Sequence, residues 1–336
     1  MTSVAVVILN YNGEELLRRF LPSVVQHSRE ARIIVADNGS TDSSLEILSR
    51  EFPEVGVIAL GANYGFCGGY NRSLLQVSAD YFVLLNSDVE VTAGWLSPLQ
   101  STLDQSKDIA AVQPKILSHR DRRLFEYAGA GGGFIDTLGY PFCRGRLFEH
   151  VEEDNGQYDD TRAVFWSSGA CMMIRAEKFH EHNGFDEDLF AHMEEIDLCW
   201  KLNRSGSLVY YCGQSTVYHL GAGTLGYHHP RKTYLNFRNG LTLIAKHLDG
   251  GEIIYKLPIR MALDWLAALF FLLRGEGRNF ISVLRAHADF LSRLRGVMKK
   301  RKAIRRRASS YPRRNIHPGL IIFEYYIRRR KTFQVQ

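Results

Sequence analysis

The first 104 residues alternate short apolar runs with amphipathic stretches, and this alternation restricts the fold more than any other feature. The apolar runs predict strands and the amphipathic stretches predict helices, because each has the hydrophobic pattern of that element. Strands that alternate with helices are typical of a mostly parallel central sheet flanked by helices, so the sequence predicts an α/β fold. The predicted strands are residues 4–9, 32–36, 55–60 and 81–85, and the predicted helices are residues 14–27, 43–51, 68–77 and 94–104.

Polar side chains directly follow three of these predicted strands. Asn10 and Asn12 come after the first strand, Asp37 after the second, and Asn86 and Asp88 after the fourth. In open α/β sheets, ligands bind outside the carboxyl ends of the strands. We therefore expect a binding site at this edge of the sheet.

The remainder of the chain is less uniform. Residues 119–162 contain few periodic runs and are predicted to form long loops over the site. Strand and helix patterns then return and continue to about residue 250, where the character of the sequence changes. A chain of 336 residues is long enough for about two domains. We place the boundary at residue 250, before a helical and basic region of residues 251–336.

The charge is distributed unevenly along the chain. The net charge is +6, yet residues 292–331 contain 15 Lys and Arg and one acid, Glu324. This segment therefore carries +14 and the rest of the chain −8, which suggests that a polyanion meets the basic tail. The five cysteines form no CxxC pair, which is typical of a protein in a reducing cytosol.

The acids that follow the strands have a structural explanation as well as a functional one. The cluster that begins at Asp37 is typical of a turn with a helix cap, although a carboxylate there also accepts hydrogen bonds from a ligand. Asp88 suits a type I turn. It also suits a divalent cation, which takes oxygen ligands and keeps positions for phosphate and water.

A second group of candidates lies further along the chain. Glu194, Glu195 and Asp197 open a predicted helix, where acids are favourable by about 0.3–1 kcal/mol each. Aromatic and apolar residues flank them, and a carboxylate held between apolar walls is suited to act as a general base. His219 follows a predicted strand and has a structural role unless a metal lies nearby.

Taken together and in order, these motifs resemble those of the family 2 glycosyltransferases, and most closely those of the rhamnosyltransferase-like branch. The resemblance covers roughly residues 3–245 and implies the GT-A fold. The matching stretches are residues 7–13, 35–42, 63–66, 84–88, 169–175, 184–187 and 194–200, followed by His219.

The resemblance implies how a nucleotide-sugar donor is bound. Asp37 would bind the nucleotide base, and the loop that contains Asn10 and Asn12 would contact the nucleoside. Asn63 and Asn86 lie in matching motifs and are assigned to the same donor site. Arg238 is also assigned to it, because Arg238-Asn239 resembles a pair found in this branch.

The resemblance also implies a metal site and a base. Asp88 matches the last acid of the DxD motif and, with His219, would hold Mg²⁺ or Mn²⁺ on the diphosphate. Glu195 falls where the ED motif places its catalytic acid. Two departures matter: Asn86 replaces the first acid of DxD, and Glu195 is one methylene longer than Asp, so Glu194 remains a rival base.

The implied reaction is an inverting, metal-dependent glycosyl transfer. A sugar, for which the resemblance favours rhamnose from dTDP-rhamnose, would move to a hydroxyl of a glycan or lipid-linked glycan in cell-surface polysaccharide synthesis. Residues 1–250 would be the GT-A catalytic domain. Its halves would be residues 1–118 for the nucleotide sugar and residues 119–250 for the acceptor and catalysis.

Two other classes of protein remain as alternatives. A sugar-phosphate nucleotidyltransferase has a similar α/β fold, but the N-terminus lacks a glycine-rich basic phosphate loop. A nucleic-acid-binding α/β protein would explain the basic tail. It would not explain three polar clusters at successive strand ends, so we expect no nucleic acid as partner.

The C-terminal region has an apolar stretch followed by basic clusters. Residues 257–273 are apolar except for Arg260 and Asp264, and the uninterrupted run of residues 265–273 is too short for the roughly 20 residues that span a membrane. It predicts an element lying in the membrane plane. The basic residues in 299–302 and 305–307 would hold it on an anionic surface, giving a cytoplasmic protein peripherally associated with the inner face of the cell membrane. The alternative is a helical pair packed on the catalytic domain.

Overall fold

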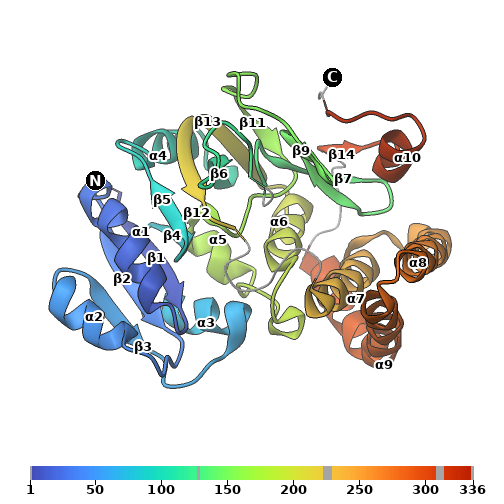
Figure 1. Cartoon of the computed structure of the whole chain (residues 1–336), viewed down its shortest axis with the longest axis horizontal. Coiled ribbons are helices and arrows are strands. Elements are labelled where there is room, and N and C mark those ends of the chain that lie inside the picture. Colours follow the sequence, from blue (N-terminus) through green and yellow to red (C-terminus); the bar gives the residue numbers. More distant parts are fainter. Residues whose placement is uncertain (1, 127–128, 222–228, 308–313, 334–336) are drawn as a thin grey trace.

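The computed structural model describes residues 2–126, 129–221, 229–307 and 314–333. Its centre is a mixed sheet with helices on both sides (Figure 1). The strand order is β11-β13-β6-β12-β4-β1-β2-β3, and β5 pairs with β13. The bounds of these strands are β1 Val4–Asn10, β2 Arg32–Asp37, β3 Gly56–Ala59, β4 Tyr81–Asn86, β5 Val89–Val91, β6 Ile109–Ser118, β11 Thr161–Val164, β12 Cys171–Arg175 and β13 Leu208–His219.

The N-terminal half confirms the predicted alternation of strands and helices. Strands β1 to β4 are parallel where they pair, and β1 and β4 lie in the middle of the sheet and are buried along almost their whole length. Burial on both faces explains why their sequences are continuous apolar runs. The helices of this half are α1 Glu14–His27, α2 Ser44–Glu51, α3 Gly65–Leu74 and α4 Leu96–Asp104.

The second half extends the sheet with strands of both directions. Strand β12 is antiparallel to β4 and to β6, while β6 and β13 are parallel to each other. Six strands, namely β1, β2, β3, β4, β6 and β13, thus run in one direction, and their carboxyl ends lie at one edge. The helical elements of this half are α5 Ala176–Glu181, the 3₁₀ turn η1 Glu187–Leu189 and α6 Glu194–Arg204.

The prediction that residues 119–162 are long loops is wrong. Part of this region forms a second, smaller sheet, order β10-β9-β8-β7-β14, whose strands are only two to four residues long. Strands this short do not produce a recognisable period, which explains the error. Their bounds are β7 Gly133–Asp136, β8 Pro141–Cys143, β9 Arg146–Leu147, β10 His150–Val151 and β14 Ile316–His317.

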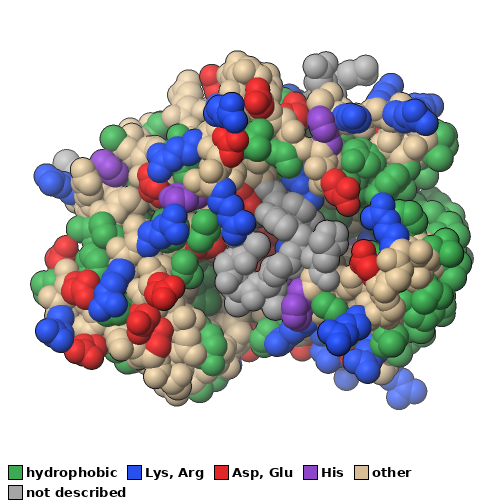
Figure 2. All heavy atoms as spheres, viewed as in Figure 1, with side chains coloured by type: hydrophobic (Ala, Val, Ile, Leu, Met, Phe, Trp, Pro, Cys, Tyr) green, Lys and Arg blue, Asp and Glu red, His purple; other side chains and the backbone are tan. Residues whose placement is uncertain are grey.

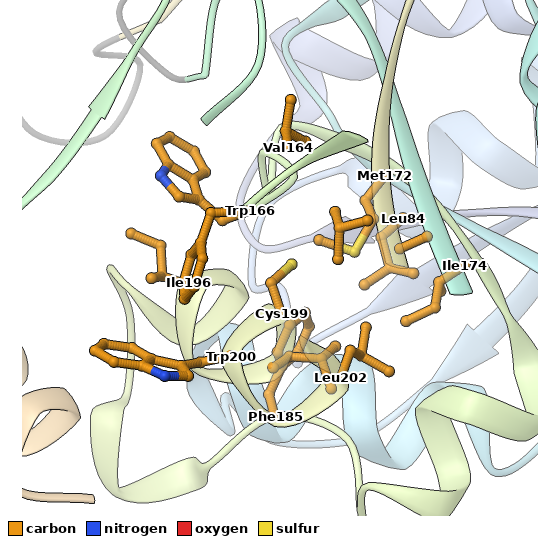
Figure 3. Close-up of a cluster of buried hydrophobic side chains, with 14 of the residues drawn as sticks. Leu84, Val164, Trp166, Met172, Ile174, Phe185, Ile196, Cys199, Trp200 and Leu202 are labelled. Atoms are coloured by element: carbon orange, nitrogen blue, oxygen red, sulfur yellow. The ribbon is translucent and has the colours of Figure 1, made fainter. Parts of the chain in front are cut away.

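Helix α6 is anchored on the main sheet by a buried apolar cluster (Figure 3). Cys199 and Leu202 of this helix point towards side chains of β4 and β12, among them Leu84 and Met172. Trp200 is fully buried on the side away from these strands. The cluster fixes α6 in place, and therefore also the acidic residues at its first turn.

The C-terminal region folds onto the catalytic part of the chain. This region comprises α8 Gly250–Leu273, α9 Gly277–Arg307 and α10 Ile321–Tyr326, and the helix that precedes it is α7 Pro230–His247. Phe290 and Val297 of α9 form a small core with Leu241 and Ala245 of α7, and β14 pairs with β7 of the small sheet. The proposed boundary at residue 250 is thus crossed by buried contacts, and an independent fold for residues 1–250 stays a prediction.

Candidate active site

The strand register brings the first predicted donor residues together. Asn10 lies opposite Asp37 between β1 and β2, and Leu9 lies opposite Asn86 between β1 and β4. Asn10 Nδ2 donates to Asp37 Oδ1 at 3.3 Å, and both side chains are buried. The other oxygen of Asp37 accepts from the backbone N–H of Ser40 at 3.0 Å. The carboxylate is therefore held rigidly at the carboxyl edge of the sheet.

Two further asparagines shape the loops around this edge. Asn12 has a positive φ of 49° and accepts the backbone N–H of Thr41 at 2.7 Å. Asn63 accepts from Asn38 Nδ2 at 3.2 Å and from the backbone N–H of Gly65 at 2.9 Å. These bonds tie the loops after β1, β2 and β3 to one another. Direct contact of Asn12 and Asn63 with a donor stays a prediction.

Asp88 and His219 are adjacent, as a shared metal site requires. Pairing of β5 with β13 places His219 beside Val89, and His219 Nε2 lies 3.1 Å from Asp88 Oδ1. The other ring nitrogen lies 3.2 Å from Glu126 Oε2, a residue that the sequence pattern did not single out. His219 thus lies between two carboxylates. Local sequence spacing could not predict this, because Glu126 follows a different strand from Asp88 and His219.

The ion pairs of His219 with Asp88 and Glu126 control the ionisation of these side chains. Burial disfavours charge on His219, but Asp88 and Glu126 outweigh it and raise the pKa of the imidazole to about 10. Burial likewise opposes the charge on Asp88, yet the hydrogen bond and charge of His219 hold its pKa below the ordinary value. As described, the site is a carboxylate–imidazolium–carboxylate arrangement.

On the Nε2 side of His219, a divalent cation would find the carboxylate of Asp88 and the imidazole, while Glu126 lies at the other ring nitrogen. The described part of the chain contains no cluster of three or more His, Cys, Asp or Glu side chains arranged to hold a metal. Asp88 and His219 therefore fit a cation only if other ligands come from the diphosphate and water, which is usual for Mg²⁺. Metal binding to His219 would also displace the proton from Nε2.

Glu194 and Glu195 begin helix α6 in a largely apolar setting. Glu194 is buried and Glu195 half-buried, and one carboxylate oxygen of each has no hydrogen-bond partner among the described residues. Burial raises the pKa of Glu195 to about 7. Burial and the neighbouring Glu195 also raise the pKa of Glu194 well above its ordinary value. An unpaired carboxyl with a pKa near neutrality has the properties of a general acid or base.

The two glutamates face the carboxyl edge of the sheet across Gly169. A side chain at Gly169 would meet Glu194 Oε1 and Glu195 Cβ, each 3.8 Å from the position of its Cβ atom. The next residue, Ala170, accepts the backbone N–H of Asn86 at 3.0 Å. Two consecutive residues, Gly169 and Ala170, thus contact the candidate base and the candidate donor edge respectively.

The backbone before α6 is strained. Phe190, His192 and Met193 have φ values of 66°, 67° and 69°, which side chains rarely adopt. Such strain costs about 1–3 kcal/mol per residue and persists only where surrounding contacts enforce it. The strained turn directly precedes Glu194, the first of the two candidate bases.

Arg238 contacts this strained turn. Its guanidinium donates to the carbonyls of Leu189 at 2.8 Å and Asp188 at 3.1 Å, and to Asn239 Oδ1 at 2.9 Å. The side chain is buried. These contacts support a role in positioning the turn, and contact of Arg238 with the donor stays a prediction.

Comparison with known proteins assigns the chain to a class. The family model described as glycosyl transferase family 2 matches residues 5–182, which is more than half of the 336 residues. The chain belongs to glycosyl transferase family 2, and it is a glycosyltransferase. This family assignment replaces the two alternatives considered from the sequence, a sugar-phosphate nucleotidyltransferase and a nucleic-acid-binding α/β protein.

Relatives place the chain within the family. The N-acetylglucosaminyl-diphospho-decaprenol L-rhamnosyltransferase of Mycobacterium tuberculosis is 28% identical over 321 residues, covering 90% of this chain and 97% of the relative. Rhamnosyltransferase WbbL of Escherichia coli is 23% identical over 260 residues, covering 75% and 94%. The protein is therefore rhamnosyltransferase-like.

A solved structure agrees with the predicted fold. The mannosyltransferase PcManGT of Pyrobaculum calidifontis, in complex with GDP-Man and Mn²⁺, superposes with a TM-score of 0.53 and is 13% identical. The match covers 90% of this chain and 80% of that one. The GT-A fold is confirmed.

Proposed function

We propose that this chain is an inverting, metal-dependent glycosyltransferase that moves L-rhamnose from a nucleotide-diphosphate sugar to a hydroxyl of a lipid-linked glycan. The observation that carries the proposal is the position of Glu194 and Glu195 across Gly169 from the donor edge. In this proposal the carboxylates lie on one side of the sugar and the diphosphate is bound on the other. An in-line displacement needs this separation of base and leaving group.

Glu195 is the proposed general base. Its ionised carboxylate takes the proton of the acceptor hydroxyl as the hydroxyl oxygen attacks the anomeric carbon, and the bond to the diphosphate breaks. The apolar surroundings keep the pKa of Glu195 near 7. At neutral pH a large fraction of its carboxyl groups is therefore ionised, and the carboxylate still binds a proton strongly enough to act as a base. No covalent sugar–enzyme intermediate is required, which is why inversion is expected.

Asp37 and Asn10 are proposed to bind the nucleotide. Asn86 is proposed to contact the donor near its diphosphate. Their support is the shared sheet edge and the hydrogen bond between Asn10 and Asp37. Asp88 and His219 would hold Mg²⁺ or Mn²⁺. When bound, such an ion neutralises charge that develops on the departing diphosphate. Mn²⁺ in a GT-A neighbour supports this assignment.

The acceptor is proposed to be a lipid-linked sugar at the inner, cytoplasmic face of the cell membrane. The support is the name of the mycobacterial relative, which specifies a sugar carried on diphospho-decaprenol. A polyprenyl carrier stays in the membrane, so the enzyme must work at its surface.

A donor panel tests the proposed function. Full-length protein is incubated with dTDP-, UDP- and GDP-sugars, with Mg²⁺, Mn²⁺ or chelator, and with N-acetylglucosaminyl-diphospho-polyprenol. Release of nucleoside diphosphate should depend on dTDP-rhamnose, on the acceptor and on metal, and NMR of the product should report an inverted anomeric centre. Activity with another donor would contradict the assignment of rhamnose, and full activity in chelator would contradict metal dependence. Retention of configuration would contradict the inverting mechanism.

A further inference from the structure

Helix α8 presents its charged side chains to the protein and its apolar side chains to the outside. The buried positions Lys256, Arg260, Asp264 and Ala268 recur every four residues and form one face. The opposite side, here called the α8 face, consists of exposed apolar side chains without a charged residue among them. These are Ile254, Tyr255, Ile259, Trp265, Leu266, Leu269, Phe270, Leu272 and Leu273.

The buried charges hold the helix in this orientation. Arg260 Nε donates to Asp264 Oδ1 at 3.0 Å, and Arg260 Nη1 donates to the carbonyl of Leu138 at 3.3 Å. His287 of α9 lies 3.3 Å from the second oxygen of Asp264, and Lys256 pairs with Glu252 at 2.6 Å. The pairs Arg260–Asp264 and Lys256–Glu252 lie within α8, but turning the helix to bury its apolar side would break its contacts with Leu138 and His287. The exposure of the α8 face is therefore enforced by the fold.

The α8 face is large, continuous and bordered by positive charge. In Figure 2, hydrophobic side chains cover the margin of the molecule where Figure 1 places α8, and Lys and Arg side chains gather on either side of it. Arg274 directly follows the face, and Arg278 and Arg285 are exposed on the neighbouring α9. Single exposed apolar residues are ordinary, but a continuous exposed apolar face marks an interaction surface.

We infer that the α8 face docks on an anionic lipid membrane, with α8 lying in the plane of the interface. The apolar side chains would enter the boundary between headgroups and acyl chains, with Tyr255 and Trp265 at the level that such residues prefer. The bordering arginines would meet anionic headgroups. The inference rests on the proposed function in one respect: a lipid-linked acceptor requires an enzyme that works at a membrane.

Two observations favour a membrane over other occupants of this face. A second copy of the chain would bring the same arginine border into contact with itself, and like charges would oppose association. None of the helices in the described ranges has the length and apolar character needed to cross a bilayer. An element with one apolar side and one charged side suits the interface instead.

The structure also changes the predicted contribution of the basic clusters. Lys300 contacts the carboxylates of Asp186 and Asp188, and Arg301 is buried and donates to the carbonyl of Ala245 at 2.9 Å. These two cations stabilise the attachment of α9 and are already engaged by groups of the protein. The apolar α8 face should therefore carry more of the membrane affinity than the clusters at residues 299–302 and 305–307.

Trp265 provides a direct probe of docking. It is 47% exposed, whereas the other three tryptophans, Trp95, Trp166 and Trp200, are between 0% and 6% exposed. Adding vesicles of phosphatidylcholine and phosphatidylglycerol to full-length protein should shift the tryptophan emission to shorter wavelength. The Trp265→Phe variant should bind the same vesicles without this shift. An unchanged spectrum of the wild type would overturn the inference.

Co-sedimentation with the same vesicles measures the affinity. Leu266→Glu with Leu273→Glu should lower vesicle binding by about tenfold or more, because both exposed side chains would lose their apolar insertion. Leu75→Glu is the matched control, since Leu75 is 75% exposed but lies at the end of α3, outside the α8 face. Equal binding of the double variant and the control would reject the α8 face as the docking surface. A wild-type dimer in sedimentation velocity that the double variant abolishes would assign the face to a second copy.

Donor hydrolysis in the absence of lipid separates this inference from the proposed function. The double variant should hydrolyse the donor at the wild-type rate, because none of the proposed catalytic residues lies in α8. Wild-type protein that docks on vesicles but turns over no nucleotide sugar would contradict the proposed function alone. Wild-type protein that turns over donor but ignores vesicles would contradict the docking alone.

Discussion

Asn239 donates its side-chain amide to the carbonyl of His192 at 2.7 Å. The same amide donates to the carbonyls of Ala191 at 3.0 Å and Leu189 at 3.1 Å, so its two N–H groups serve three acceptors. Asn239 is fully buried in α7, and His192 lies in the strained turn before α6. The contact links α7 to the first turn of α6, in which the candidate base Glu195 is the second residue.

Replacing Asn239 by Ala should lower transfer more than donor binding. The change removes the donors that hold the turn, and loss of a buried hydrogen bond costs about 1–3 kcal/mol. A turn free to relax would misplace Glu195, so we expect kcat to fall on the order of tenfold or more while KM for the donor changes little. Thr242→Val is the control, because Thr242 Oγ1 also makes a buried bond in α7 but to the Arg238 carbonyl. Equal kcat loss in both variants would indicate a general loss of stability.

Replacing Glu195 by Gln should leave donor affinity intact and stop most transfer. Gln has nearly the same size but cannot accept the proton, and loss of a general base typically costs about 10²–10⁴ in rate. Single-turnover transfer and isothermal titration with the donor measure the two properties separately. Glu194→Gln is the paired variant. If Glu194→Gln loses the transfer rate and Glu195→Gln does not, Glu194 is the base.

The rate of transfer should rise with pH through about 7. Burial raises the pKa of Glu195 to about 7, and a base acts only in its ionised form. Below this pKa the ionised fraction, and with it kcat, should fall about tenfold per pH unit. The residual activity of Glu195→Gln should lack this limb. A wild-type profile that is flat between about pH 5 and 8 would remove Glu195 from the role.

The sequence was sufficient to predict the architecture where burial dictates composition. β1 and β4 are buried on both faces, so nearly all of their residues are apolar. Such continuous apolar segments can be recognised as strands even though apolar and polar residues do not alternate in them. Parallel strands end at one edge, so Asn10 and Asp37 could be placed together before any geometry was known. The small sheet was missed because its strands are too short to leave a pattern.

Other parts of the site depend on partners that are distant in sequence. Glu195 and Asp197 belong to one acidic run, yet Asp197 pairs with Lys246 of α7 and Glu195 has no cation beside it among the described residues. Local sequence could not separate these roles. A recognisable signal did exist for α8: the spacing of four between Lys256, Arg260 and Asp264 places the charges on one helical face.

Replacing Asp88 by Asn should weaken metal binding in the presence of nucleoside diphosphate. Asp88 is the one acid that the motif offers to the metal, and the amide of Asn is a much weaker ligand. Electron paramagnetic resonance of Mn²⁺ with dTDP measures binding without turnover, and we expect a loss of tenfold or more. Glu90→Gln is the control, because Glu90 lies two residues away and pairs with Arg122. Unchanged Mn²⁺ binding in Asp88→Asn would refute the assignment.

Asp197 should be required for stability rather than for catalysis. It is fully buried at the junction of α6 and α7, where it lies 2.6 Å from Lys246 Nζ and 2.8 Å from His247 Nε2. Burial opposes its charge, but Lys246, Lys201 and His247 hold the pKa of the carboxyl well below its ordinary value. The carboxylate is therefore ionised throughout the physiological range, and it is already paired, so it is poorly suited to accept a proton from an acceptor.

Asp197→Asn should lower the free energy of unfolding by about 3–5 kcal/mol at neutral pH, because breaking a buried ion pair leaves an uncompensated charge. The matched control is Asp188→Asn, whose ion pair with Lys300 is exposed and should be worth less than about 1 kcal/mol. The depressed pKa means that the stabilisation by Asp197 is present above about pH 4, the unfolded value, and is lost as pH falls through the lower folded value. Urea unfolding should therefore give curves for wild type and Asp197→Asn that converge in acid. A difference that persists unchanged below about pH 2, or equal effects of the two variants at neutral pH, would contradict this role.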